Sequence, residues 1–324
     1  MQRNSLGAAI IAKNSAVSIK KAILSVGSIV RQIVVVDTGS DDGTPVLCSR
    51  LGCEVHLFRW CDDFSAARNY ALSKMRTEWI ISIDSDEALD IKSYESQSEL
   101  LCINNYGGIN TILYNYLDPQ CSNISKHRFT RIFRNHPKIR YSGIIHEQIR
   151  PSIESLGLEI IDSDIIIEHF GYSEIGSDKL ERNIRMLAAE LTRQPGDGWL
   201  QYHLGETYFT AKNMEDAKLY FVKSIDSGLL SSEQQEKARL RLAQIALQEE
   251  DFDTVNKRTS FISRDKDIEG FRKYILATGL LVQKRFKDAF ALYISAETAQ
   301  SSLVDKGQLG RAIELIKKVN NDNN

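Results

Sequence analysis

Cysteine is scarce in this sequence and lies at one end of it. Five cysteines occur among the 324 residues, all within the first 121 positions, and no two have the C-x-x-C spacing. An odd number without that spacing argues against a disulfide framework and against a zinc site. We therefore expect reduced thiols and a cytoplasmic protein.

Long apolar runs are also missing. No segment approaches the roughly 18 apolar residues that a membrane span needs. The apolar run from Leu6 to Ala12 follows Arg3, as in a signal peptide, but it is at the lower length limit and no convincing cleavage site precedes Lys13. We interpret this run as a first buried strand.

Neither sign of charge is in excess. The chain has 41 Lys and Arg against 43 Asp and Glu, a formal net charge of −2. These totals do not require a basic face, so nucleic acid is not an expected partner. With 42% apolar and 26% charged residues the composition is that of an ordinary globular protein, and the length suggests about two domains.

The first ninety residues alternate strand and helix patterns. Apolar runs predict strands at 6–12, 32–37, 54–58 and 79–83, and helical spacing with capping residues predicts helices from Asn14 or Ser15, from Thr44 to Gly52 and from Ser65 to Met75. This order predicts an α/β domain with a parallel sheet and helices on both faces. Further strand-like stretches follow at 110–117, 128–135, 138–149 and 158–170.

From about Ser177 the sequence contains helix formers and almost no strand pattern. The small, polar stretch GYSEIGSDK marks a boundary, so we expect domains at 1–175 and 176–324. Three related segments begin at Leu204, Leu242 and Leu276, in steps of 38 and 34 residues, close to the tetratricopeptide period. We expect an all-α domain of paired helices similar to tetratricopeptide repeats (TPR-like), with an irregular bundle as the alternative.

Acidic residues gather where two predicted strands end. Asp37 ends QIVVVD, and Asp84 and Asp86 follow WIISI as an Asp-x-Asp (DXD) motif. Because ligands bind at the carboxyl ends of the strands in an open parallel sheet, both groups should lie on one edge. Three other Asp-x-Asp pairs lack this placement, and we interpret them as structural or solvated: Asp162/Asp164, Asp251/Asp253 and Asp265/Asp267.

Six motifs in a fixed order resemble a known family. IIAKN, IVVVDTGSDDGT, FRWCDDFSAARNYAL and WIISIDSDE resemble the nucleotide-sugar half of family 2 inverting glycosyltransferases. RIFRNHPKIRYSGIIHEQI and IIIEHFGY extend the similarity to the branch with TPR-like repeats behind the catalytic domain, which includes the sublancin S-glycosyltransferase. The resemblance implies a GT-A, Rossmann-like domain for nucleotide-diphosphosugar transfer and an enzyme of the hexosyltransferase type.

The resemblance also implies roles at the strand ends. Asp37 would accept a hydrogen bond from the nucleotide base, and Asp84 would hold the ribose or take part in the metal site. Asp86 would ligate a divalent cation, Mn²⁺ or Mg²⁺, that bridges the diphosphate. His169 would complete this metal site, with a satisfied core histidine as the alternative.

Basic residues are implied on the donor side. Arg68 would offer a charged fork to phosphate, with an ion pair to Asp62 or Asp63 on the helix surface as the alternative. The family often has Asn-Glu where this chain has Asn14 and Ser15, which leaves that position open. Lys13 is a further donor-site candidate, and Arg131 and Arg134 could contact phosphate or the acceptor, without a single forced role.

The general base is expected in the motif after YSGII. Glu147 would take the proton of the acceptor nucleophile, with His146 as its neighbour or as a contact of the diphosphate. A surface pair at a strand end is the alternative for both residues.

The leading function is transfer of a sugar from a nucleotide donor, a UDP-sugar as first expectation, to an acceptor bound through the repeats. Two acceptor classes stay open: a Cys or Ser side chain of a peptide or protein, and a lipid-linked or cell-envelope saccharide. A nucleotidyltransferase would need a Gly-rich loop that IIAKNSAVS lacks, and a non-catalytic repeat scaffold would not need intact acidic motifs. Homodimer formation through the helical domain is also left open.

Overall fold

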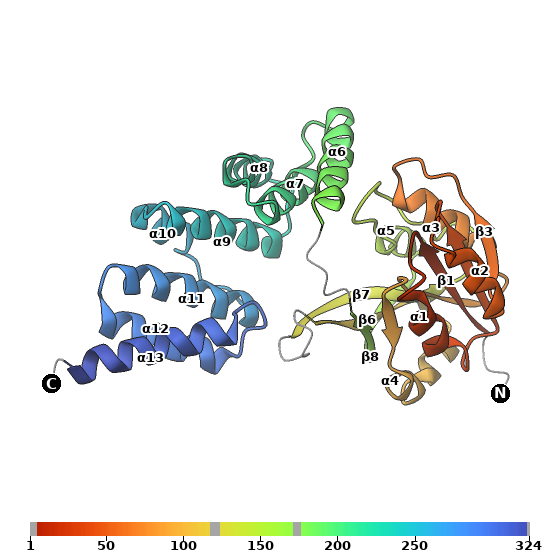
Figure 1. Ribbon diagram of the computed structural model, residues 1–324, viewed down its shortest axis with the longest axis horizontal. Coiled ribbons are helices and arrows are strands. Elements are labelled where there is room, and N and C mark those ends of the chain that lie inside the picture. Colours follow the sequence, from red (N-terminus) through yellow and green to blue (C-terminus); the bar gives the residue numbers. More distant parts are fainter. Residues whose placement is uncertain (1–4, 117–123, 171–175, 323–324) are drawn as a thin grey trace. The chain divides into compact units, whose positions relative to one another are not determined.

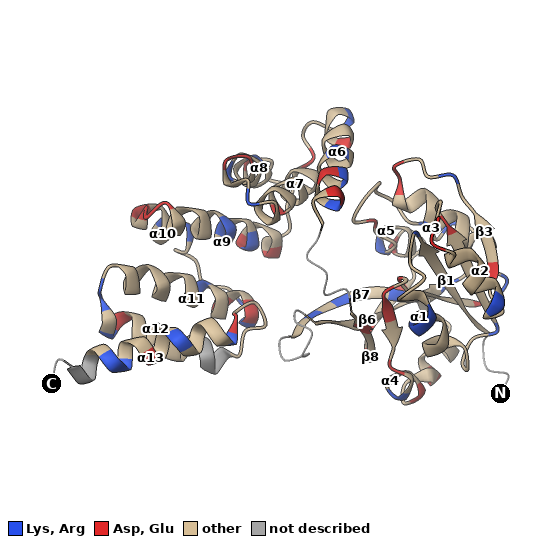
Figure 2. Cartoon of the chain, in the orientation of Figure 1, with Lys and Arg blue, Asp and Glu red and all other residues tan. Residues whose placement is uncertain are grey.

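The computed structural model describes residues 5–116, 124–170 and 176–322 (Figure 1). The chain divides into two compact units, Met1–Ser173 and Glu174–Asn324. The boundary that we expected after residue 175 adjoins residues 171–175, which lie outside the described residues. Basic and acidic positions are interspersed along both units (Figure 2), in keeping with the balanced charge.

The N-terminal unit is built on an eight-stranded sheet with the order β3-β2-β1-β4-β7-β6-β8-β5. The four strands of the first part, β1 to β4, run parallel to one another, as predicted. The later strands make the sheet mixed, because β7 runs antiparallel to β4 and β6. The strands are β1 (Leu6–Ala12), β2 (Gln32–Asp37), β3 (Glu54–Leu57), β4 (Trp79–Ser82), β5 (Glu87–Leu89), β6 (Tyr106–Tyr116), β7 (Ile124–Arg134) and β8 (Glu159–His169).

Helices cover both faces of the parallel strands. On one face α1 (Ile19–Val26) and α2 (Thr44–Arg50) share a core cluster with Ile10 and Val35, and on the other α3 (Phe64–Leu72) packs with the alternate strand residues. Strands buried on both faces read as continuous apolar runs, which explains QIVVVD. Shorter elements complete the unit: α4 (Ile91–Glu95), the 3-10 helix η1 (Ser98–Cys102) and α5 (Arg150–Glu154).

Residues 138–149, which we expected to form strand structure, form a loop instead. One isolated bridge pairs Ser142 with Gln148. Between them the chain reverses, because Gly143 and His146 have left-handed φ values of 94° and 54°. The expectation was wrong here because the apolar side chains in this stretch pack onto the core without pairing as a strand.

The cysteines of the N-terminal unit are free thiols where the structure describes them. Cys48 and Cys53 are buried, and Cys61 and Cys102 are exposed. Cys121 lies outside the described residues.

The C-terminal unit is helical throughout its described part, and the three predicted repeats are helix pairs: α7/α8, α9/α10 and α11/α12. At the equivalent positions Gly205, Ala243 and Ala277 are small and buried, and a Cβ on Gly205 would lie 2.7 Å from the Phe221 ring. The TPR-like reading is therefore confirmed. The helices are α6 (Ser177–Arg193), α7 (Gly198–Thr210), α8 (Met214–Asp226), α9 (Ser232–Gln248), α10 (Phe252–Arg258), α11 (Lys266–Val282), α12 (Phe286–Ala299) and α13 (Lys306–Asp322).

Candidate active site

The two acidic groups lie on one edge of the sheet. In the register of the parallel strands, Ala12 of β1 pairs with Asp37 of β2, and Ala9 of β1 pairs with Ser82 of β4. The carboxyl ends of β1, β2 and β4 therefore meet, with Asp84 just beyond β4. This is the arrangement that the alternation of strands and helices predicted.

The loops that follow these strands are fastened to one another. The Asn14 N–H donates to Ser40 Oγ at 2.8 Å, and the Asp41 N–H donates to Asn14 Oδ1 at 2.9 Å. The Ser15 hydroxyl lies 2.9 Å from the Ser85 hydroxyl, which joins the first loop to the Asp-x-Asp turn. The Ser15 position, left open by the sequence, is thus a tie between two loops of the site.

Asp37 is buried at the base of its loop, with 1% of its surface exposed. Its Oδ2 accepts from the backbone N–H groups of Gly39 at 3.1 Å and Ser40 at 3.0 Å. The carboxylate thus fixes the turn after β2. Lys13 lies at the same edge, just after β1, and is exposed.

Arg68 lies at the centre of a group of charged side chains at this edge of the sheet. It is 8% exposed on α3, its Nη2 donates to Asp84 Oδ1 at 2.8 Å, and its Nη1 donates to Ser82 Oγ at 3.1 Å. Its Nε donates to the Glu147 carboxylate. Asp63, one of the two partners that we considered as the alternative, caps α3 by accepting from the Ala66 N–H.

The loop that carries Glu147 is held against α3. The Asn69 amide exchanges two hydrogen bonds of 2.9 Å with the backbone of Tyr141, and the Phe64 N–H donates to the Ile144 carbonyl at 2.8 Å. The Glu147 side chain, 11% exposed, is thereby brought to Arg68. His146 beside it is exposed, in the left-handed backbone conformation.

Arg131, a candidate with no single forced role, and Glu87, to which the sequence assigned no role, join the group. Arg131 Nη2 donates to Asp84 Oδ2 at 3.2 Å and to Glu87 Oε1 at 2.7 Å. Glu87 Oε2 accepts from the Asp84 N–H at 2.8 Å. The position of Glu87 directly after the Asp-x-Asp motif was the one signal in the sequence that could have pointed to it.

The surroundings of Asp84 and Glu87 shift the pKa values of these two carboxyl groups in opposite directions. Burial opposes ionisation of Asp84, but the guanidinium groups of Arg68 and Arg131 outweigh it and hold the pKa of this carboxyl below its usual range. Burial raises the pKa of Glu87 to about 7, opposed by Arg131 and reinforced by the Asp84 charge.

Asp86 and His169 face each other at the ends of β5 and β8. Asp86 Oδ2 lies 3.3 Å from His169 Nε2, and the other ring nitrogen lies 2.7 Å from Asn115 Oδ1. The hydrogen bond to Asp86, ahead of the opposing effect of burial, raises the pKa of His169. A neighbour on Nδ1 also orients an imidazole whose Nε2 would bind a metal, so these residues fit a cation between them.

Within the described part of the chain, no three His, Cys, Asp or Glu side chains are grouped to hold a metal by themselves. A cation at Asp86 and His169 would thus take its other ligands from elsewhere, as Mn²⁺ and Mg²⁺ commonly do from substrate phosphates.

The structure does not bring Arg134 to this group. Its Nε and Nη2 donate to the carbonyls of Tyr106 at 3.2 Å and Ile103 at 3.0 Å, and its guanidinium lies 4.4 Å from the Trp79 ring centre. Arg134 pairs with Trp79 at the start of β4, whereas Asp84 follows the end of that strand. It therefore lies at the opposite edge of the sheet.

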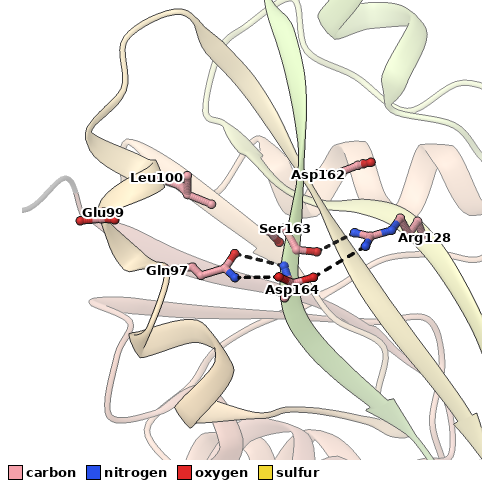
Figure 3. Close-up of a pocket in the computed structure, with 7 residues that line it drawn as sticks. All are labelled: Gln97, Glu99, Leu100, Arg128, Asp162, Ser163 and Asp164. Carbon is pink, nitrogen blue, oxygen red and sulfur yellow. Dashed lines mark hydrogen bonds and ion pairs between the residues drawn. The ribbon is translucent and has the colours of Figure 1, made fainter.

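A polar pocket of about 320 Å³ lies at the irregularity of β8 (Figure 3). Arg128 Nη1 donates to the Ser163 carbonyl at 2.6 Å and its Nη2 lies 3.7 Å from Asp164 Oδ1, while Asp164 also meets Gln97 (Figure 3). Asp162 accepts from the Asn110 amide at 2.7 Å. Both aspartates of this pair are thus engaged by neighbouring side chains.

The Asp-x-Asp pairs of the helical unit are at helix starts. Asp251 accepts from the Thr254 N–H and caps α10, and Asp265 accepts from the Ile268 N–H and caps α11. Capping, which the sequence interpretation had not specified, explains why an aspartate stands there.

Comparison with known proteins identifies the N-terminal unit. Residues 8–156 match the profile described as glycosyl transferase family 2. This unit is a family 2 glycosyltransferase domain. The matched range contains each residue of the acidic and basic group described above except His169.

Two curated proteins resemble the chain beyond the glycosyltransferase domain. A TPR repeat-containing protein of Synechococcus elongatus is 31% identical over 214 residues, which are 62% of this chain and 49% of that protein. The SPbeta prophage-derived glycosyltransferase SunS of Bacillus subtilis is 27% identical over 224 residues, 67% of this chain and 52% of SunS. The chain spans about half the length of these relatives.

Among solved structures, TarS residues 1–349 of S. aureus overlays with a TM-score of 0.43 at 12% identity, over 80% of this chain and 93% of that one. The mixed sheet covered by helices, followed by TPR-like pairs, is of the fold class that the sequence predicted.

Among the described helices, none has the length and apolar character needed to cross a bilayer.

Proposed function

We propose that this chain is an inverting, metal-dependent glycosyltransferase that moves a sugar from a nucleotide-diphosphate donor, in the first instance a UDP-sugar, to an acceptor. The observation that carries the proposal is the group at one sheet edge of a family 2 glycosyltransferase domain. In it a buried arginine, Arg68, joins the donor-side carboxylate Asp84 to a second carboxylate, Glu147.

On the donor side, Asp37 and its loop would receive the nucleotide base, with Lys13 at the rim and Arg68 and Asp84 toward the ribose and phosphates. Asp86 and His169 would hold Mn²⁺ or Mg²⁺, and their separation of 3.3 Å supports this assignment. When bound, the cation offsets the charge that develops on the departing diphosphate. Because Arg134 caps carbonyls at the far edge, we leave it out of the donor site.

On the acceptor side, Glu147 would accept the proton of the nucleophile. Its contact with Arg68 supports this role, because a base must be held in one orientation relative to the reacting atoms. His146, exposed beside it, would be its neighbour in the reaction or a contact of the diphosphate.

The helical unit would select the acceptor. We propose that residues 1–175 perform the chemistry and that residues 176–324 bind a peptide or protein whose Cys or Ser side chain receives the sugar. Paired helices that stack as a solenoid offer an extended surface to such a partner. SunS, which is similar to this chain in sequence, is named a glycosyltransferase. A lipid-linked or cell-envelope saccharide is the competing acceptor, and a homodimer through this unit stays part of the hypothesis.

The test is release of nucleoside diphosphate from a panel of nucleotide sugars in the presence of Mn²⁺. We expect hydrolysis of one donor by the wild-type chain, and loss of it on addition of a chelator. Asp86→Asn should behave as the chelated enzyme does while melting at the wild-type temperature. Release that is insensitive to chelator would remove the metal from the proposal, and no release from any donor would argue against the function.

A further inference from the structure

Arg131 is a buried cation that the donor and acceptor roles above leave unused. Its side chain is 14% exposed, and it touches two carboxylates, Asp84 and Glu87. An arginine so far from water is stable only with such partners. Arg131 is thus a second guanidinium group beside Asp84, in addition to that of Arg68.

Glu87 holds Arg131 in one place. Its side chain is 2% exposed, one oxygen accepts from Arg131 at 2.7 Å, and the other accepts from the Asp84 N–H at 2.8 Å. Both carboxylate oxygens of Glu87 thus accept hydrogen bonds from the protein, so Glu87 supports Arg131 and Asp84 and does not bind a ligand.

The two aspartates of the motif are consequently not equivalent. Each oxygen of Asp84 faces an arginine: Oδ1 lies 2.8 Å from Arg68 and Oδ2 lies 3.2 Å from Arg131. The Asp86 side chain is 41% exposed and faces His169. The charge of Asp84 is therefore neutralised from inside the protein, whereas that of Asp86 is open to a cation from outside.

We propose that Arg131 is a positioning residue that holds Asp84 for the nucleotide and, with Arg68, sets the charge of the donor site so that the divalent cation binds at Asp86. This inference rests on the proposed function. Arg131 need not touch the substrate, because it acts through the orientation and charge of Asp84.

The sign of the effect separates this role from a merely structural one. Removing the buried positive charge beside Asp84 and Glu87 should strengthen the binding of a dication and weaken the binding of an anionic nucleotide. Loss of local structure would instead weaken both. Opposite changes in the two affinities are thus the signature of the proposal.

The experiment is calorimetric titration of the full chain with two separate probes, Mn²⁺ alone and UDP without metal. For Arg131→Gln, which removes the charge and keeps a hydrogen-bond donor, we expect Mn²⁺ to bind at least about tenfold more tightly and UDP at least about tenfold more weakly. Arg131→Lys keeps the charge and should stay within a few fold of wild type for Mn²⁺. If Arg131→Gln does not fold, Arg131→Met serves in its place.

The matched control is Arg128→Gln on the same strand. Arg128 also pairs with a carboxylate and a carbonyl, but it does so in the pocket of Figure 3 and is 44% exposed. Arg128→Gln should leave the affinities for Mn²⁺ and for UDP unchanged. If wild type binds both probes and Arg131→Gln weakens both or changes neither, the inference is wrong and the proposed function stands. If wild type binds neither probe, alone or with the other present, the proposed function fails and the inference with it.

Discussion

At the scale of single residues, Glu147 tests the chemistry most directly. Glu147→Gln keeps an oxygen that accepts from Arg68 but cannot take a proton. We expect donor affinity near the wild-type value and a fall in turnover of roughly two to four orders of magnitude. Steady-state transfer and calorimetric donor binding, measured on the same preparation, check both parts.

The pH dependence of this variant bears on the acceptor. A thiol, with an ordinary pKa of about 8.5, ionises without a base as the pH rises, whereas a hydroxyl does not. Rising pH should therefore partly rescue Glu147→Gln if the acceptor is cysteine, and should not if it is serine or a sugar. Near-normal turnover at neutral pH would remove Glu147 as the base and turn attention to His146.

At the scale of elements, the first repeat depends on a close helix approach. In α7 a Cβ on Gly205 would lie 2.7 and 2.8 Å from ring atoms of Phe221 in α8. We expect Gly205→Ala to lower the free energy of unfolding of the helical unit by about 1–3 kcal/mol, because a well-packed contact must open. Urea unfolding followed by circular dichroism measures this change.

Gly279 in α11 provides the matched control. A Cβ there would meet its nearest neighbours at 3.7 Å, an ordinary contact. Gly279→Ala should therefore stabilise the unit by about 0.5–1 kcal/mol, since alanine loses less entropy in a helix. The same sign for both substitutions would contradict the packing that we assign to Gly205.

The first turn of α11 carries a pH-dependent contribution to stability. Burial opposes ionisation of Glu269, but its bonds to Arg272 and to the Ser263 N–H outweigh burial and keep its pKa below the ordinary value of 4.5. A lowered pKa stabilises the fold above the unfolded pKa, and this contribution is lost as the pH falls through the folded pKa.

We therefore expect Glu269→Gln to cost about 1–2 kcal/mol of unfolding free energy at pH 7, with the difference from wild type shrinking below about pH 4.5. Denaturant unfolding across this range provides the measurement. Glu249→Gln removes an exposed pair with Lys218, 46% and 49% exposed, and should change stability by less than about 0.5 kcal/mol at every pH. A pH-independent loss in Glu269→Gln would mean that packing, and not charge, is what the variant removes.

At the scale of the whole molecule, the two units have separate cores. The clusters around Ile10 and Val34 belong to the glycosyltransferase domain, and those around Phe221, Tyr293 and Ile275 belong to the helical unit. We expect a chain ending at residue 176 to melt cooperatively, to hydrolyse the donor at a rate near that of the full chain, and to lose transfer to its acceptor. Donor hydrolysis and transfer should be assayed side by side.

Equal transfer by the short and full chains would show that the repeats take no part in acceptor choice. Oligomeric state must be measured on both chains by light scattering, because a dimer through the helical unit would also be lost on truncation. Loss of donor hydrolysis together with cooperative melting would instead mean that the helical unit contributes to the donor site.

The sequence by itself determined the features that are local along the chain. Apolar runs specified β1 and β2, helical spacing and small residues specified the repeat pairs, and alternation of strands with helices placed Asp37 and Asp84 on one edge. Each of these follows from periodicity within one or two elements. The motifs around Arg68 and Glu147 were likewise recognisable as a series.

Only the tertiary structure decided which residues of those motifs meet. Arg131 and Arg134 stand three positions apart on β7, and the antiparallel register that pairs Ile81 with Ile132 brings the first to Asp84 and the second to the opposite edge. Strand register is set by pairing between distant segments, so periodicity along one strand does not reveal it. In the same way, Arg68 pairs with Glu147 rather than with Asp63 because the loop after β7 is hydrogen-bonded to α3. This contact joins residues more than seventy positions apart, so no local sequence pattern predicts it.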